Sequence, residues 1–135
     1  MNDTGAQIEI IPARFEDFQI NFEAFEQMLQ PGVAAILINS PNNPSGVAYT
    51  GETLEKLSSL LAAKSKELGY NLFLISDEPY REIAFGGREI PYPARFYPHT
   101  LTCYSFSKSL SVPGERIGYV AVCPECEHAE DIVPM

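Results

Sequence analysis

The sequence predicts an α/β domain of the three-layer α/β/α class, built on a mostly parallel sheet. Three apolar runs, Val33–Asn39, Leu72–Ser76 and Leu101–Ser105, are bounded by turn residues, which is typical of adjacent parallel strands buried on both faces. Helical spacing of leucines separates the first two runs. A fourth run, Ile117–Val122, follows after a link too short for a crossover helix, so we expect it to pair antiparallel.

Two helices are predicted from their end signals and their apolar spacing. Asn21 can cap a helix that carries Phe22, Phe25, Met28 and Leu29 and ends before Pro31-Gly32. Thr50 is placed to cap a second helix, and Gly69 closes it. The apolar stripe of this second helix consists of Leu54, Leu57, Leu60, Leu61 and Leu68. The sequence therefore predicts the order helix, strand, helix, strand, loop, strand, strand.

Composition excludes several classes of function. The chain has 135 residues, which is the length of one ordinary domain, and a net charge of -9 without any basic run. This charge argues against binding to nucleic acid or to an anionic membrane surface. The longest apolar stretches are too short to span a bilayer, and the first residues lack the pattern of a secretory signal. The 3 cysteines are an odd count, which favours reduced thiols and a cytoplasmic location.

Polar side chains follow the three parallel strands. Asn43 lies in a loop after the first strand, Asp77 directly follows the second, and Lys108 follows the third. The carboxyl ends of parallel strands meet at one edge of an open sheet, and ligands bind in the crevice there. We therefore expect an amide, a carboxylate and an amine to converge on one site.

Four motifs make this site more specific. They are Asn39-Ser-Pro-Asn-Asn-Pro-Ser-Gly46, Ser76-Asp-Glu-Pro-Tyr80, Ser105-Phe-Ser-Lys-Ser109 and Gly114-Glu-Arg-Ile-Gly118. In this order and roughly this spacing they resemble the signatures of the fold-type I, pyridoxal-phosphate (PLP)-dependent aminotransferases of class I/II. The resemblance covers nearly the whole chain beyond Phe15 and implies the core of that family's large, cofactor-binding domain.

The resemblance assigns the chemistry to Lys108, Asp77, Tyr80 and Asn43. Lys108 resembles the lysine that holds PLP as a Schiff base and later acts as a base. Asp77 resembles the aspartate that keeps the pyridine nitrogen protonated. An opposite charge within about 4–6 Å favours the charged form of a group and shifts its pKa by about 1–3 units. Tyr80 and Asn43 resemble the two groups that hydrogen-bond the phenolic oxygen of the cofactor.

Two further residues resemble ligands of the cofactor phosphate. Ser105 lies three residues before Lys108, and Arg116 lies eight residues after it, as in the family pattern. Arginine presents a planar fork of donors that suits phosphate oxygens. Ser107 is a weaker candidate for the same role.

The resemblance implies transfer of an amino group between an amino acid and a 2-oxo acid, with a homodimer or another self-associated form. Proteins of this family are much longer, so residues 1–135 are expected to form part of the large domain only. An N-terminal part, with a ring that stacks on PLP, and a C-terminal small domain, with an arginine for the substrate carboxylate, would be absent. We expect such a fragment to be inactive alone.

Other interpretations stay open. A related PLP enzyme, such as a C–S β-lyase or an aminocyclopropane-carboxylate synthase, would share every motif, and the chain could instead be a non-catalytic interaction module. Ser105-Phe-Ser-Lys108 also fits the S-x-x-K motif of serine β-lactamases, but their S-D-N and K-T-G partners are missing. Cys123-Pro-Glu-Cys126 with His128 resembles half of a zinc site, and we expect no metal.

Overall fold

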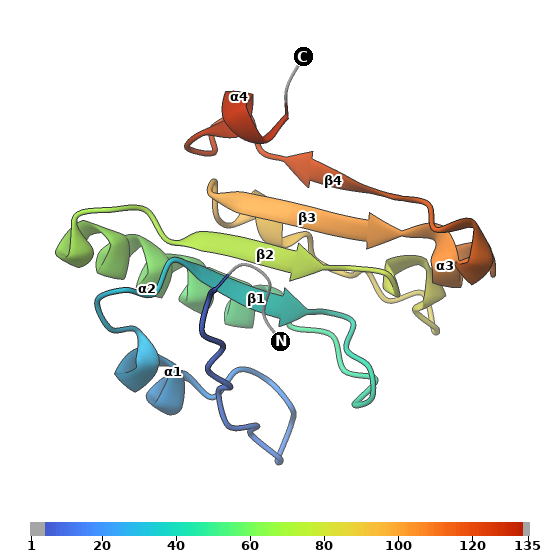
Figure 1. Cartoon of the computed structure of the whole chain (residues 1–135). Helices are drawn as coiled ribbons and strands as arrows, with labels where there is room; N and C mark the ends of the chain where they lie inside the picture. The colour runs from blue at the N-terminus through green and yellow to red at the C-terminus, as the bar shows by residue number, and fades with distance from the viewer. Residues whose placement is uncertain (1–4, 134–135) are drawn as a thin grey trace.

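A computed structural model describes residues 5–133 and contains one four-stranded sheet (Figure 1). The strands are β1 (Ala35–Asn39), β2 (Phe73–Asp77), β3 (Thr100–Ser105) and β4 (Gly118–Val122), and they lie side by side in this order. Strands β1, β2 and β3 are parallel, and β4 is antiparallel to β3. The predicted fold class, the number of strands and their directions are confirmed.

The observed strand ends differ from the predicted ones by one or two residues, each for a local reason. Strand β1 starts at Ala35 rather than Val33, because the Val33 backbone N–H donates to the carbonyl of Gln30 in the preceding turn (3.1 Å). Asp77 is the last residue of β2 instead of following it, and it pairs with Cys103 of β3. The side chain of Asp77 therefore has its direction set by the sheet.

The two predicted helices are present with the predicted caps. Helix α1 spans Phe22–Met28, and the Asn21 side chain accepts a backbone N–H of its first turn. Helix α2 spans Gly51–Leu68, is capped in the same way by Thr50, and ends at Gly69 with φ 79°. A positive φ favours glycine, which explains why the helix stops there.

The sequence did not predict the short helical turns. These are the 3₁₀ turns η1 (Arg81–Ile83), η2 (Pro93–Arg95) and η3 (Pro113–Glu115), and the one-turn helices α3 (Phe106–Ser109) and α4 (Ala129–Ile132). A single turn is too short to show helical periodicity in a sequence. Two of these turns, η1 and α3, carry parts of the site described below.

The core lies between α1, α2 and one face of the sheet. Leu54, Leu57 and Leu61 of α2 are each at most 2% exposed, and burying each side chain contributes about 2 kcal/mol. They pack against the strand residues that point to this face, Ile36, Ile38 and Leu74, and against Phe25, Leu29 and Tyr97. Helix α2 lies behind the sheet in Figure 1.

The opposite face of the sheet is open in the described part of the chain. Leu37, which alternates with the buried Ile36 and Ile38, is 70% exposed, and Val120 of β4 is 52% exposed. Residues 5–133 thus contain the sheet and one helical layer of the three-layer arrangement. No helix in this range is both long and apolar enough to cross a membrane.

Candidate active site

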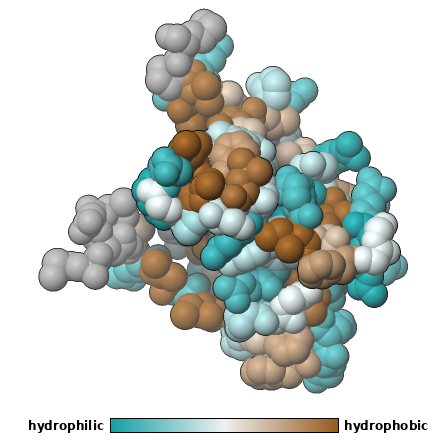
Figure 2. Space-filling model, turned by 90° about the vertical axis from the view of Figure 1, so that its right-hand side faces the viewer, coloured by the Kyte–Doolittle hydropathy of each residue, from teal (hydrophilic) through white to brown (hydrophobic). Residues whose placement is uncertain are grey.

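The carboxyl ends of β1, β2 and β3 meet at one edge of the sheet, at the right of Figure 1. Pairing aligns Asn39 with Asp77 and Asp77 with Cys103, so these three residues share one row and one face. Figure 2 looks onto this edge and shows polar and apolar side chains interspersed over it. Loops and short helices that follow the strands carry the other candidate residues.

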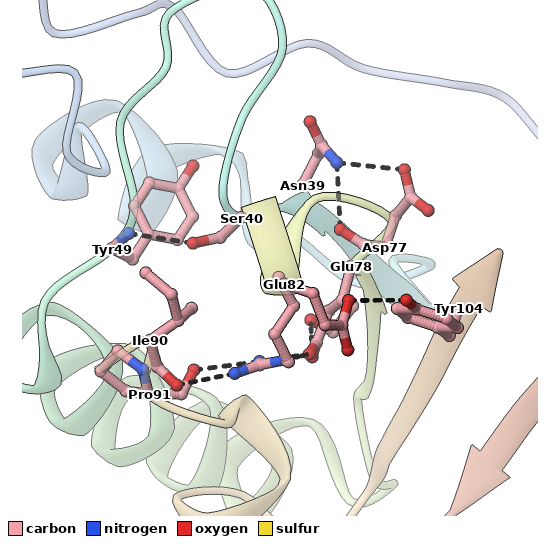
Figure 3. Close-up of polar contacts among 11 residues, drawn as sticks. Asn39, Ser40, Tyr49, Asp77, Glu78, Glu82, Ile90, Pro91 and Tyr104 are labelled. Atoms are coloured by element: carbon pink, nitrogen blue, oxygen red, sulfur yellow. Dashed lines mark hydrogen bonds and ion pairs between the residues drawn. The ribbon is translucent and has the colours of Figure 1, made fainter. Parts of the chain in front are cut away.

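Asn39 holds the carboxylate of Asp77. The Asn39 Nδ2 donates to Asp77 Oδ2 at 3.1 Å and to the Asp77 backbone oxygen at 3.0 Å (Figure 3). Burial raises the pKa of Asp77, and the hydrogen bond from Asn39 opposes this rise. Among residues 5–133, Asp77 takes part in no ion pair. Its carboxylate is therefore oriented and partly desolvated, and a cation beside it would lower its pKa.

A continuous set of contacts leads from Asp77 to Lys108. Asn39 Oδ1 accepts the backbone N–H of Asn43 at 3.0 Å, and Asn43 Nδ2 donates to Tyr80 Oη at 3.0 Å. The Lys108 Nζ lies 5.8 Å from the centre of the Tyr80 ring, within the range of a cation–π contact. The structure thus brings Asp77, Asn43, Tyr80 and Lys108 into one cluster, connected through Asn39.

A buried ion pair fixes the loop that carries Tyr80. Glu78 is fully buried and Arg81 is 9% exposed. The Arg81 Nε donates to Glu78 Oε2 at 2.6 Å and Nη2 contacts the same oxygen, while Ser76 Oγ donates to Glu78 Oε1 at 2.7 Å. Arg81 also donates to the backbone oxygens of Ile90 (2.6 Å) and Pro91 (3.2 Å), as Figure 3 shows. Each guanidinium nitrogen of Arg81 and each carboxylate oxygen of Glu78 has a hydrogen-bond partner, as burial of charges requires.

Ser105 and Lys108 lie on the third segment of the site. Ser105 caps α3: its Oγ accepts the Ser107 backbone N–H at 3.2 Å and donates to Ser107 Oγ at 2.8 Å. Lys108, in the only turn of α3, is exposed. Within residues 5–133, both hydrogen bonds of Ser105 Oγ are to Ser107 and none is to Lys108, so the arrangement does not favour the S-x-x-K interpretation.

Arg116 lies near this edge but does not join the cluster. It has φ 55°, is exposed, and its Nη1 donates to the Pro113 backbone oxygen at 3.2 Å. Two residues later, Gly118 pairs with Ser105, which places Arg116 at the same end of the sheet. A Cβ at Gly118 would overlap the backbone oxygen of Tyr104, so glycine is required for this close pairing.

Sequence reasoning missed the residues that support the cluster. Asn39 is the first residue of the motif that ends at Gly46, and its position opposite Asp77 becomes visible only once the register of β1 and β2 is known. Glu78 and Arg81 have i,i+3 spacing, which is usually a sign of a solvated ion pair. The one available signal was that Glu78 sits between two expected site residues.

The cysteine motif does not form a metal site within the described residues. Cys103, Cys123 and Cys126 are free thiols. No group of three or more His, Cys, Asp or Glu side chains in residues 5–133 could hold a metal ion.

Residues 2–133 match the family "Aminotransferase class I and II". The chain belongs to this family. A probable aspartate/prephenate aminotransferase of Aquifex aeolicus is 36% identical over an alignment of 135 positions, which covers 97% of this chain and 32% of that protein. An arginine–pyruvate transaminase of Pseudomonas aeruginosa is 35% identical, with 95% and 32% covered. The chain thus spans about a third of the length of these aminotransferases.

A solved structure agrees with this assignment. The amino transferase of Eubacterium rectale superimposes with a TM-score of 0.85 and 54% sequence identity over 87% of this chain and 29% of that protein. At this identity the likeness extends beyond the fold class. The mostly parallel sheet with its helices therefore matches the α/β fold of an aminotransferase large domain.

Proposed function

We propose that the protein carrying this chain is a PLP-dependent aminotransferase, which transfers an amino group between an amino acid and a 2-oxo acid. The observation that carries this proposal is family membership combined with the connected cluster from Asp77 to Lys108. The relatives that are similar in sequence and the solved structure that is similar in fold are all named as aminotransferases, which favours this reaction over the lyase and synthase alternatives. Their names differ in the amino acid, so the proposal stops at the substrate class.

The side chains of the cluster fit PLP. This cofactor supplies an aldehyde that bonds to amines and a ring that withdraws electrons from the substrate Cα. The exposed Lys108 amine would hold the cofactor covalently. Asp77, partly desolvated and in no ion pair within the described residues, would keep the ring nitrogen protonated.

Tyr80 and Asn43 would bind the phenolic oxygen of the cofactor. The hydrogen bond from Asn43 Nδ2 to Tyr80 Oη uses the hydroxyl as an acceptor, so the Tyr80 proton remains able to donate. For the phosphate we propose Ser105 and Arg116, which border the same edge. Arg116 would have to exchange its bond to Pro113 for the phosphate.

Lys108 would also move protons. When free, the Lys108 amine would act as the base that takes the proton from the substrate Cα and as the acid that returns it. The Tyr80 ring beneath the Lys108 amine limits where that amine can reach. The path of the proton would thus be set by α3 and by the loop after β2.

The remaining assignments belong to the same proposal. Residues 1–135 would form part of the PLP-binding large domain, and the protein would act as a homodimer. The three free thiols support a reducing compartment, for which we propose the cytoplasm.

Covalent trapping tests the role of Lys108. The chain is incubated with PLP, reduced with borohydride and digested, and the modified lysine is found by mass spectrometry. We expect Lys108 to be labelled well above Lys56, Lys64 and Lys66 of α2. Substituting Lys108→Arg should abolish this label, and the matched Lys66→Arg should not. Equal labelling of all four lysines would contradict the proposal.

A further inference from the structure

A buried tyrosine is hydrogen-bonded to the two segments that follow Tyr80 and Lys108, η1 and α3. Tyr104 is the penultimate residue of β3 and is 8% exposed. Because strand residues alternate in direction, its side chain points to the opposite face from Cys103 and Ser105. Its ring packs edge-on against Phe106, with 5.2 Å between the ring centres, and stacks on Tyr119 of β4, with 5.1 Å between the ring centres. These contacts fix where the hydroxyl group lies.

The Tyr104 hydroxyl makes two short hydrogen bonds to different segments. It lies 2.6 Å from Glu82 Oε2 in η1 and 2.7 Å from Ser109 Oγ in α3 (the bond to Glu82 is drawn in Figure 3). The hydroxyl has one proton, and a carboxylate can only accept, so Tyr104 donates to Glu82 and accepts from Ser109. Burial, with the bond to Glu82 next, raises the pKa of Tyr104, which keeps this donor protonated at neutral pH.

Each of the two hydrogen-bond partners of the Tyr104 hydroxyl is close in sequence to a residue of the cluster. Glu82 follows Tyr80 by two residues, and Ser109 directly follows Lys108. The two segments, η1 and α3, also pack against each other. Hydrogen bonds to a charged group are stronger than those between neutral groups, so the bond to Glu82 can select one arrangement of the two short turns.

We propose that Tyr104 is a positioning residue, whose hydroxyl sets the distance between the Lys108 amine and the Tyr80 ring by binding Glu82 and Ser109 together. This role rests on the proposed function of Lys108 and Tyr80. It adds a residue on the face of the sheet away from Asp77, where it would not touch the cofactor. Its effect on the reaction would pass entirely through the placement of η1 and α3 relative to each other.

A purely structural role would give a different result. Tyr104 could serve only to stabilise the fold, as Thr100 does on the same strand, where its buried Oγ1 donates to the Tyr97 backbone oxygen at 2.6 Å. Thr100→Val is therefore a matched control. It removes a buried hydroxyl from β3 at the end of the strand away from Lys108. It leaves the hydrogen bonds of Tyr104 to Glu82 and Ser109 intact.

The test measures the contact itself, without cofactor. In the isotopically labelled 135-residue chain, we expect the Tyr80 ring to shift the NMR signals of the Lys108 ε-protons, and Tyr80→Leu supplies the value without a ring. We expect Tyr104→Phe to remove at least half of this ring-current shift. We expect Thr100→Val to retain it, even where both variants lose similar thermal stability. Retention of the full shift in Tyr104→Phe would overturn the proposal.

Two outer variants keep the test decisive if Tyr104→Phe does not fold. Ser109→Ala and Glu82→Ala each remove one partner of the hydroxyl without changing β3, and each should reduce the ring-current shift. Glu82→Gln keeps an acceptor oxygen and should restore the shift that Glu82→Ala loses. An unchanged shift in both alanine variants would also overturn the proposal.

Trapping with PLP then separates this inference from the proposed function. If positioning matters, the rate of borohydride-trapped labelling at Lys108 should fall about tenfold in Tyr104→Phe, matching the loss of about 1.4 kcal/mol. Absent Lys108 labelling in the unaltered chain would contradict the proposed function, while the cofactor-free NMR result would still decide whether Tyr104 positions Lys108. A normal rate of Lys108 labelling in Tyr104→Phe would contradict the inference that Tyr104 affects the reaction of Lys108 with PLP.

Discussion

Breaking the buried pair between Glu78 and Arg81 should cost more than any surface ion pair in the chain. Substituting Arg81→Met would leave the Glu78 carboxylate, which is 0% exposed, with only Ser76 as a donor. It would also leave the backbone oxygens of Ile90 and Pro91 without the arginine. An uncompensated buried charge costs about 3–5 kcal/mol. For a chain of this size that is a fall in Tm of roughly 10–20 °C.

Urea unfolding followed by circular dichroism measures this cost, provided that two probes give the same transition. The matched control is Arg14→Met, which breaks another i,i+3 pair, with Asp17, whose side chains are 49% and 38% exposed; we expect a cost of about 0–1 kcal/mol. The double variant Glu78→Gln with Arg81→Met leaves no buried charge and should recover part of the stability. A cost below about 1 kcal/mol for Arg81→Met would refute this reasoning.

Three further predictions follow from other parts of the chain. Because burial raises the pKa of Asp77, its stabilising contribution is present below its unfolded pKa and is lost as pH rises through the folded value. Asp77→Asn, which can still accept from Asn39, should therefore raise Tm at pH 7, with no gain at pH 3, and a gain at both would contradict this. Gly118→Ala should destabilise the chain by about 1–3 kcal/mol, because its Cβ would meet the Tyr104 backbone oxygen, and amide exchange should increase first in β4. The open face should make the isolated chain self-associate, and Leu37→Lys should lower the mass found by light scattering; concentration-independent monomers of the unaltered chain would disprove this.

The regular part of the fold could be predicted because its signals are local. Apolar runs flanked by turn residues located all four strands, and capping residues located both long helices. The antiparallel direction of β4 followed from the length of the link before it. The loop between Tyr80 and Thr100 could not be predicted in detail, since its turns depend on contacts such as those of Arg81 with distant backbone oxygens.

The site was predictable only in its motif residues. Their spacing along the chain indicated which residues meet at the carboxyl ends of the strands, and the contacts among Asn43, Tyr80 and Lys108 are consistent with that expectation. The roles of these residues toward PLP remain predictions, as do those of Ser105 and Arg116. Supporting residues such as Tyr104 could not be found, because a tyrosine in an apolar strand has the same pattern whether its hydroxyl is used or not.

The alternation of side chains along a strand explains how the site and its support are divided. In β2, Ser76 points to the helical layer and bonds Glu78, while the next residue, Asp77, points to the open face. In β3, Tyr104 points to the helical layer, and the next residue, Ser105, points the other way. Two of the candidate cofactor ligands, Asp77 and Ser105, thus directly follow a buried polar residue that anchors the adjoining loop. Because the anchoring bonds lie on the face covered by the core, the residues on the open face need not contribute to stability, and a partly desolvated carboxylate can be maintained there.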